Sequence, residues 1–426
     1  MTQLAPGPRT SRGGSERSAA SPVFASLAVR NYRLWAAGSL VSNTGTWMQR
    51  VAQDWLVLTV LTDESAVALG VVTALQFGPA LLLGQLAGIA ADRLPQRALL
   101  MATQALSGVW ALLLGVLVVT GSAELWSVYV LAGLLGTTSA FDGPVRLTFV
   151  ASLVGPDRLA NAVALNSASF NAARLVGPGA AGLLIAAVGT GPVFLVNAAT
   201  FAATCLALAA LRSSEIEPLP RARRGRGATR EALASVRRRP DVVLVLLVVG
   251  LVSAFGLNFP MTTALMARVE FARGPAEFGL LGSVLAIGSL TGALLAARRR
   301  APTIRLVVGA AAAFGASALL AAVMPTYATF ALALVPVGMS ALTVLTAANA
   351  LVQTTTEPAL RGRVVALYMT VLVGTTPIGA PAIGWLAEVA GPRWAIAAGG
   401  LTALAAAAVA GAVLLRRRAV TPDDGA

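Results

Sequence analysis

Histidine and lysine are absent from this 426-residue chain, and cysteine occurs only once, as Cys205. A disulfide needs two cysteines, and many metal sites and acid–base catalysts depend on histidine or cysteine. Charged residues are also scarce, at 12% of the chain. The sequence therefore predicts no disulfide, no metal site and no cofactor, and we do not expect an enzyme.

Apolar residues, by contrast, make up 57% of the chain, a proportion outside the range of soluble domains. Stretches long enough to cross a bilayer recur along the sequence, separated by short breaks that contain proline, glycine or arginine. Twelve such stretches are 31–60, 66–91, 98–120, 125–150, 160–188, 191–211, 241–267, 276–297, 304–324, 327–353, 364–388 and 393–415. The sequence predicts an all-α membrane protein with twelve transmembrane helices.

All 32 basic residues are arginines, and most of them fall in the tails and loops of one side of the membrane if both termini share that side. Cytoplasmic loops of membrane proteins carry such an excess of basic residues. We therefore expect a multi-pass membrane protein with both termini in the cytoplasm, and the all-arginine, alanine-rich composition indicates the inner membrane of a bacterium. The net charge of +14 then reflects topology and attraction to membrane lipid rather than binding of nucleic acid.

A polar segment at 213–240 divides the predicted spans into two sets of six. One constant shift along the chain places Gly182 on Gly384 and Gly189 on Gly391, so the two sets look like copies of each other. Parallel six-helix repeats with a binding site between them are typical of one large class of membrane transporters. The predicted organisation is a disordered cytoplasmic tail at 1–29, pseudo-symmetric six-helix bundles at 30–212 and 241–416, a cytoplasmic linker at 213–240 and a tail at 417–426.

The first predicted span carries a stripe of polar side chains. On a helix, Asn43, Trp47, Arg50, Gln53 and Asp54 fall within about 120° of arc, and apolar residues occupy the far side. A charged residue at the centre of a lipid-exposed helix costs about 2.5–3.5 kcal/mol. The stripe is therefore expected to face a central cavity rather than lipid.

A second signal lies in the short loop after the second span. Gly88, Asp92, Arg93 and Arg97 form a Gly-x-x-x-Asp-Arg pattern with a basic residue four positions further on. Here the chain resembles the major facilitator superfamily, in which this loop acts as a latch for one conformational state. The resemblance implies that Asp92 bonds a neighbouring helix terminus and that Arg93 pairs with an acid of the fourth span, for which Asp142 is the candidate.

Two further stretches narrow the resemblance. Asp142 and Arg146 lie four residues apart near the inner end of the fourth span, and we expect them to belong to the latch. Gly177, Pro178 and Gly182 match part of a Gly/Pro-rich element associated with exporters, in which the proline would kink the fifth span. Together these stretches resemble the exporter branch that includes macrolide-efflux and siderophore-secretion proteins similar to enterobactin exporters.

Asp54 has two possible roles. An exporter driven by the proton gradient needs a membrane carboxylate that alternates between protonated and charged forms, and Asp54 is the candidate. Arg50 lies one helical turn before it, and an opposite charge so close favours the ionised carboxylate. In the alternative hypothesis, the two residues form a structural salt bridge or a gate near the outer mouth of the cavity.

Arg174 lies about halfway along the fifth span, where an arginine needs a partner. One hypothesis pairs it with Asp142, and the other has it present a fixed positive charge to an anionic group of the cargo. Further polar candidates for the cavity are Asn171, Asn258, Thr346 and Asn349.

The sequence thus predicts a monomeric secondary transporter that exports small amphipathic molecules, such as a drug, an antibiotic or a siderophore. Transport would proceed by alternating access, in exchange for protons. The alternatives are an importer or symporter of a small solute and, from another class, a transport-inactive membrane sensor or scaffold. A membrane enzyme is disfavoured because no paired acids or His/Cys ligands stand at a membrane face.

Overall fold

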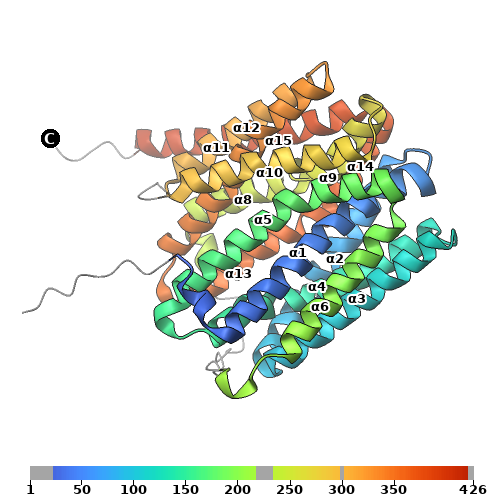
Figure 1. Ribbon diagram of the computed structural model, residues 1–426. Helices are drawn as coiled ribbons and strands as arrows, with labels where there is room; N and C mark the ends of the chain where they lie inside the picture. Colours follow the sequence, from blue (N-terminus) through green and yellow to red (C-terminus); the bar gives the residue numbers. More distant parts are fainter. Residues whose placement is uncertain (1–22, 217–233, 298–301, 421–426) are drawn as a thin grey trace, which may run out of the picture.

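The computed structural model describes residues 23–216, 234–297 and 302–420, and these residues form helices joined by short connections, with no strand among them. The helices run side by side across Figure 1, with the first half of the chain below the second. The first half comprises η1 (Ala25–Ala28), α1 (Arg30–Leu56), η2 (Val57–Leu61), α2 (Ala66–Arg93), α3 (Gln96–Val119), α4 (Leu125–Leu153), α5 (Pro156–Val188) and α6 (Gly191–Ala209).

The second half is built in the same way, although two of its predicted spans consist of more than one helix. After η3 (Ser213–Glu215), the first of these spans comprises α8 (Pro240–Leu251), η4 (Val252–Gly256), α9 (Phe259–Leu265) and η5 (Met266–Glu270). The remaining helices are α10 (Pro275–Ala297), α11 (Ile304–Ala322), α12 (Tyr327–Thr355), α13 (Pro358–Gly374), α14 (Thr376–Ala390) and α15 (Pro392–Val420).

Ten helical segments of the described residues are long and apolar enough to cross a membrane. Helices α1 and α4 are similarly long, with 27 and 29 residues. Each of them carries a charged pair within its length: Arg50 and Asp54 in α1, and Asp142 and Arg146 in α4. The predicted all-α membrane fold is confirmed, whereas the count of twelve requires that these two polar helices also cross.

The two halves share helix boundaries. Helices α5 and α14 end at Gly189 and Gly391, whose φ angles of 81° and 97° lie in the left-handed region that glycine adopts at helix ends. Pro156 and Pro358 occupy the first positions of α5 and α13, where the missing N–H removes no helical hydrogen bond. The shift that aligns the two glycines also aligns the two prolines, which supports duplication of an ancestral half.

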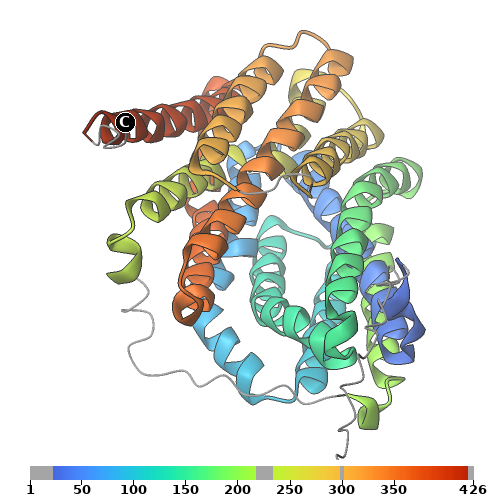
Figure 2. The ribbon, with the colours of Figure 1, turned by 90° about the vertical axis from the view of Figure 1, so that its left-hand side faces the viewer.

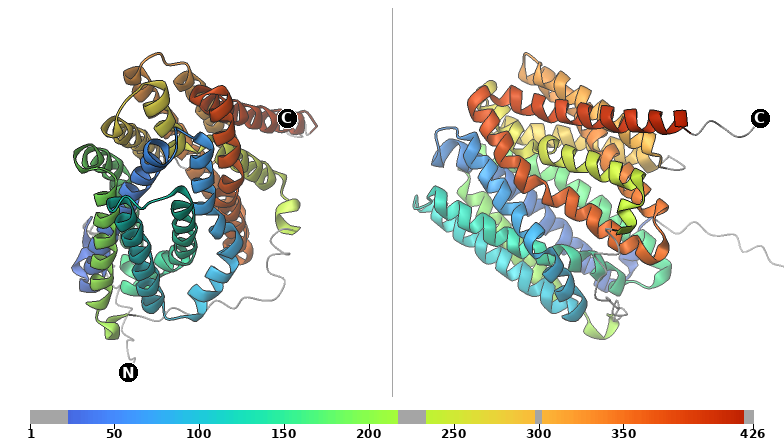
Figure 3. Two further views of the ribbon diagram at one scale, coloured as in Figure 1. Left: turned by 90° about the vertical axis from the view of Figure 1, so that its right-hand side faces the viewer. Right: turned by 180° about the vertical axis from the view of Figure 1, so that it is seen from behind.

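The halves meet along two pairs of helices. Helix α5 packs against α10, as Figure 1 shows, and α2 packs against α14, the blue and red helices of Figure 3. Small residues allow this approach, because a Cβ on Gly70 would lie 2.7 Å from the carbonyl oxygen of Ala380. Likewise, a Cβ on Gly279 would lie 2.3 Å from the carbonyl oxygen of Pro178.

Helix α1 begins and α15 ends at the same end of the bundle, which is on the left in Figure 1 and faces the viewer in Figure 2. We call this end the chain-end side. At the opposite side, polar contacts join the halves: Arg268 Nε lies 2.8 Å from Glu64 Oε1. The Glu388 carboxylate also accepts hydrogen bonds there, from Ser65 Oγ at 3.2 Å and from the Val67 amide at 3.0 Å.

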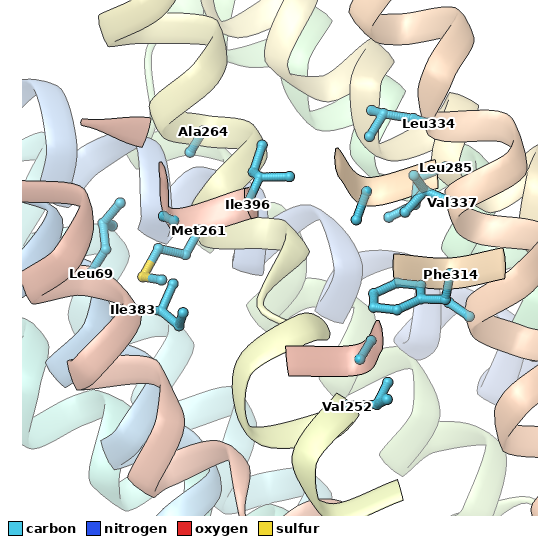
Figure 4. Close-up of a cluster of buried hydrophobic side chains, with 14 of the residues drawn as sticks. Leu69, Val252, Met261, Ala264, Leu285, Phe314, Leu334, Val337, Ile383 and Ile396 are labelled. Carbon is cyan, nitrogen blue, oxygen red and sulfur yellow. The ribbon is translucent and has the colours of Figure 1, made fainter. Parts of the chain in front are cut away.

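Apolar side chains from both halves form one core near these junctions. Figure 4 shows Leu69 of α2 beside Met261 of α9 and Ile383 of α14, and Phe314 of α11 near Val252. Since lipid tails are as apolar as these side chains, close packing rather than escape from water holds such helices together.

Three predicted boundaries differ from the structure. Residues 25–28, expected in the disordered tail, form η1, because Ser26 is buried against α5. Its amide donates to Asn161 Oδ1 at 2.9 Å, and its hydroxyl donates to the Arg158 carbonyl at 3.1 Å. Helix α15 continues to Val420, past the expected end at 416, and η3 lies within the expected linker. Of the predicted tails and linker, residues 1–22, 217–233 and 421–426 lie outside the described residues, whereas 234–237 of the linker are helical.

Candidate functional site

A cavity of about 230 Å³ lies between the two halves. Helices α1, α2 and α5 contribute its wall from the first half, and α9, α10, α12 and α14 contribute from the second. The lining residues are Trp47, Arg50, Val51, Asp54, Thr73, Gln76, Phe77, Arg174, Pro178, Leu257, Asn258, Phe259, Pro260, Met261, Thr263, Phe278, Gly282, Leu285, Ser289, Gly338, Ala341, Leu342, Leu345 and Thr376. Most of these side chains are apolar, and three of them, Arg50, Asp54 and Arg174, are charged.

Two of the charged residues gather around one aromatic ring. The guanidinium carbon of Arg50 lies 4.8 Å from the ring centroid of Trp47 and 5.5 Å from that of Phe77. The guanidinium carbon of Arg174 lies 5.8 Å from the same Trp47 ring. Gly177 makes this possible, because any Cβ there would lie 2.6 Å from Trp47 Cβ. Cation–π attraction therefore holds both arginines at the cavity wall.

Asp54 lies in the same wall, with 5% of its surface exposed. Within the part of the chain that the structure describes, its carboxylate has no hydrogen bond and no arginine nitrogen within 4.0 Å. Arg50 is the charged residue that acts on it most strongly. The expected salt bridge between Arg50 and Asp54 is thus not formed in this structure, because the guanidinium lies against Trp47 and Phe77 instead.

An aromatic pair connects the two halves next to Asp54. Trp55 of α1 stacks on Phe278 of α10, with ring centroids 5.8 Å apart and an angle of 22° between the ring planes. Both rings are buried. Phe278 lines the cavity, whereas Trp55 is not among its lining residues and belongs to the apolar core.

Asp142 lies in a separate cluster between α3, α4 and α1. Its carboxylate accepts from Arg146 Nε at 2.8 Å, Thr103 Oγ1 at 2.9 Å and Gln104 Nε2 at 2.8 Å. The expected pairs of Asp142 with Arg174 and with Arg93 are therefore not formed. The reason is local, because Arg146 lies one helical turn away on the same helix and its guanidinium bonds the Asp142 carboxylate.

The predicted latch residues lie at the chain-end side. Gly88, Asp92 and Arg93 are in the last turns of α2, and Arg93 is exposed. Arg97, near the start of α3, donates to the carbonyls of Leu208 and Ala209, each at 2.9 Å. These carbonyls belong to the last turn of α6, where helical partners are missing. Arg97 therefore ties α3 to α6 within the first half.

The described residues contain no cluster of three or more His, Cys, Asp or Glu side chains that could hold a metal ion. Polar and charged groups within a mostly apolar wall could orient a small molecule, as in sites that bind drug-sized ligands.

Comparison with known proteins identifies the family of this chain. A family model described as transmembrane secretion effector, within the major facilitator superfamily, matches residues 20–422. The chain belongs to this family. It is accordingly a member of a transporter family rather than an enzyme family, and the predicted superfamily and exporter branch are confirmed.

Curated relatives of this transporter act in efflux and siderophore transport. The multidrug efflux pump Tap of Mycolicibacterium fortuitum is 30% identical over 377 residues, which cover 83% of this chain and 88% of the pump. The staphyloferrin A transporter of Staphylococcus aureus is 33% identical over 155 residues, or 36% of this chain and 38% of that transporter.

A solved structure shares the fold. A bacterial homologue of the human lysosomal transporter Spinster, in an inward-facing and unoccupied conformation, superposes with a TM-score of 0.68 at 16% sequence identity. The match covers 91% of this chain and 98% of the homologue. At this identity the likeness concerns the fold alone, which is that of a major facilitator transporter with two helical halves.

The structure brings only part of the predicted set to the cavity of the transporter. Trp47, Arg50, Asp54, Arg174, Pro178 and Asn258 line it, whereas Asn43, Gln53, Asn171, Thr346 and Asn349 are not among its lining residues. Asn171, Thr346 and Asn349 instead bond within their own helices. Gln53 is buried outside the cavity, and its Nε2 atom has no hydrogen-bond partner among the described residues. The predicted element around Pro178 also has a packing role, because a Cβ on Gly182 would lie 2.5 Å from the Pro275 carbonyl oxygen.

Several wall residues were missed from the sequence. Thr73 and Gln76 of α2 are polar residues three apart in an apolar helix, which is the same signal that singled out α1. Phe278, Met261 and Leu285 gave no such signal, because an apolar residue in a membrane helix is expected whether it faces lipid, protein or a cavity.

Proposed function

We propose that this transporter exports small amphipathic molecules from the cytoplasm across the bacterial inner membrane, in exchange for protons. The observation that carries the proposal is the cavity between the two halves, in which apolar walls surround Asp54, a buried carboxylate without a hydrogen bond or ion pair in the described chain. Tap and the staphyloferrin A transporter, two relatives that move small molecules, support it.

Alternating access would proceed by rocking of residues 30–212 against 241–416, with 213–240 as the linker. The contacts of Glu64 with Arg268 and of Glu388 with Ser65 close the opposite side. With both termini in the cytoplasm, as the arginine distribution favours, this conformation is the one that receives cargo from the cytoplasm, and the protein acts as a monomer.

Asp54 is the proposed proton site. Its carboxylate has no fixed partner among the described residues, so a proton can bind it without first breaking a salt bridge. Protonation removes a buried charge from the wall between the two halves, and it thereby links proton occupancy to the orientation of the halves.

The proposal is tested in proteoliposomes that contain the purified protein and a pH-sensitive dye. Staphyloferrin A, an anion, and ethidium and rhodamine 6G, both cations, serve as probe substrates at the face corresponding to the cytoplasm, so that movement of either charge class is detected. Export with proton exchange predicts probe movement that accelerates with an opposing proton gradient and that moves protons in the other direction. Probe and protons moving together would indicate a symporter or importer, and binding without movement would indicate a sensor.

Membrane orientation is tested separately. The chain has a single cysteine, Cys205, so a Cys205→Ser background accepts one new cysteine at a time. An exposed cysteine introduced at Arg93 should react with an impermeant maleimide only from the cytoplasm. Labelling from outside would reverse the proposed topology and, with it, the proposed direction of transport.

A further inference from the structure

The charges of the cavity wall do not balance. Arg50 and Arg174 each contribute a positive charge, and Asp54 is the one acid among the lining residues of the cavity. Asp54 attracts Arg50, whereas Arg174 repels it. Even with Asp54 ionised, the wall therefore retains one positive charge, and the position of Asp54 beside Arg50 leaves that excess at Arg174.

Arg174 also has hydrogen-bonding capacity to spare. A guanidinium carries five N–H donors, and in the described part of the chain those of Arg174 form no hydrogen bond and no ion pair. Its contact with Trp47, at 5.8 Å from the ring centroid, anchors the side chain through the ring face. The donors of the guanidinium thus remain available for a ligand, and the ligand group that they fit best is an oxyanion.

Asn258 offers a second unused polar atom in the same wall. Its side chain is 2% exposed, and its Nδ2 group donates to the Ala254 carbonyl at 2.8 Å. Its Oδ1 atom is buried and has no donor within the described residues. Since buried acceptors in proteins are almost always paired, this atom points to a hydrogen-bond donor on a bound molecule.

The remainder of the wall is suited to an apolar body. Phe77 of α2 and Phe259 of α9 line it from the two halves, with Met261 and Leu285. Aromatic and aliphatic walls with a few placed polar groups are typical of sites for drug-sized ligands.

We propose that the cavity binds an apolar, ring-containing organic anion, with its carboxylate or equivalent oxyanion on Arg174 and its ring system against the phenylalanines. A donor group of the same molecule reaches Asn258. This inference rests on the proposed transport function and names its substrate class.

The charge of the cargo has a consequence for its export. An anion leaving a cell whose interior is electrically negative moves down the membrane potential. Exchange of one monovalent anion for one entering proton moves two charges in the favourable sense, so export is driven by the potential as well as by the pH gradient.

The test uses the full-length protein in lipid nanodiscs and three probes of nearly equal shape: 2-naphthoate, the neutral 2-naphthamide and the cationic 2-naphthamidine. Isothermal titration should rank the carboxylate first and the amidine last. In Arg174→Gln, affinity for the carboxylate should fall about ten- to a hundredfold, as for loss of a charge-assisted hydrogen bond, while affinity for the amide stays unchanged. Arg174→Lys should restore part of the carboxylate affinity.

Arg305→Gln is the matched control, because Arg305 is an exposed arginine outside the cavity wall. It should bind all three probes as the wild type does. The proposal is overturned if the amidine binds more tightly than the carboxylate, or if Arg174→Gln weakens the carboxylate and the amide equally. Absence of saturable carboxylate binding below about 1 mM also overturns it.

These results are separable from the transport test. Carboxylate binding that depends on Arg174, without probe movement in proteoliposomes, would leave the anion site intact and remove the transport proposal. Movement of the probes without a preference for the anion would support the transport proposal and remove the anion site.

Discussion

Arg50 and Arg174 share one aromatic partner, since their guanidinium carbons lie 4.8 Å and 5.8 Å from the ring centroid of Trp47. The two positive charges repel each other, yet both remain at the cavity wall because the face of the indole attracts each of them. Trp47 thereby fixes where positive charge stands in the cavity.

Replacing Trp47 should loosen both arginines. Each cation–π contact stabilises by about 0.5–2 kcal/mol, so Trp47→Leu should lower the affinity for 2-naphthoate by roughly three- to thirtyfold. Trp47→Phe should retain part of the affinity, because a phenyl ring is a weaker cation–π partner. Trp385→Leu, at a tryptophan that is 61% exposed and outside the cavity wall, is the control. Equal affinities in Trp47→Leu and the control would contradict the anchoring role.

Asp54→Asn should separate binding from proton coupling. The amide cannot release a proton, so proton-driven export in proteoliposomes should fall at least about tenfold, the scale on which loss of a positioned proton carrier acts. The substitution also removes the negative charge of the cavity, so 2-naphthoate should bind more tightly. Unaltered proton-driven export at normal protein levels would exclude Asp54 as the proton carrier. Weaker binding of the anion would contradict the inference that Asp54 offsets part of the positive charge of the cavity wall.

Gly70→Val should prevent the halves from closing at the opposite side. A Cβ at Gly70 would lie 2.7 Å from the Ala380 carbonyl oxygen and 3.0 Å from Pro381 Cα, and both are backbone atoms that cannot move aside without shifting α14. We expect increased maleimide labelling, from the opposite side, of a cysteine introduced at Thr73 in the cavity wall, together with slower transport. Gly84→Val is the control on the same helix, because nothing lies within 4 Å of its added Cβ. Identical labelling of the two variants would show that the close approach does not control closure.

Asp142→Asn should destabilise the first half. The Asp142 and Arg146 side chains are 13% and 16% exposed, and the carboxylate has three hydrogen-bond donors. Leaving Arg146 without a counter-ion should lower the free energy of unfolding by about 2–3 kcal/mol, measured by thermal unfolding in detergent. Glu215→Gln is the control, because it breaks an exposed ion pair in which the Glu215 side chain is 42% exposed and that of Arg212 is 60% exposed. It should change the free energy of unfolding by less than about 1 kcal/mol. Similar losses in both variants would argue against the Asp142 cluster as a structural anchor.

Local sequence rules predicted much of this site. Helical periodicity placed Trp47, Arg50 and Asp54 on one face, and the expense of charge in lipid assigned that face to the interior. All three line the cavity. Asn43, Gln53 and Asn349, predicted by the same rules, are not among the lining residues. Asn349 instead accepts a hydrogen bond within its own helix, an outcome that helical periodicity cannot distinguish from a cavity position.

The sequence by itself determined the class of protein, the two-half organisation and the helices that carry charge, because hydropathy, periodicity and duplication are properties of the chain. Tertiary structure alone decided the partners of those charges. Arg50 lies against Trp47 and Phe77 rather than Asp54, and Asp142 bonds Arg146 rather than Arg174. The physical reason is that partners across helices depend on the rotation and register of each helix. Those are set by contacts such as Gly177 against Trp47 and Gly70 against Ala380, which no single segment of sequence contains.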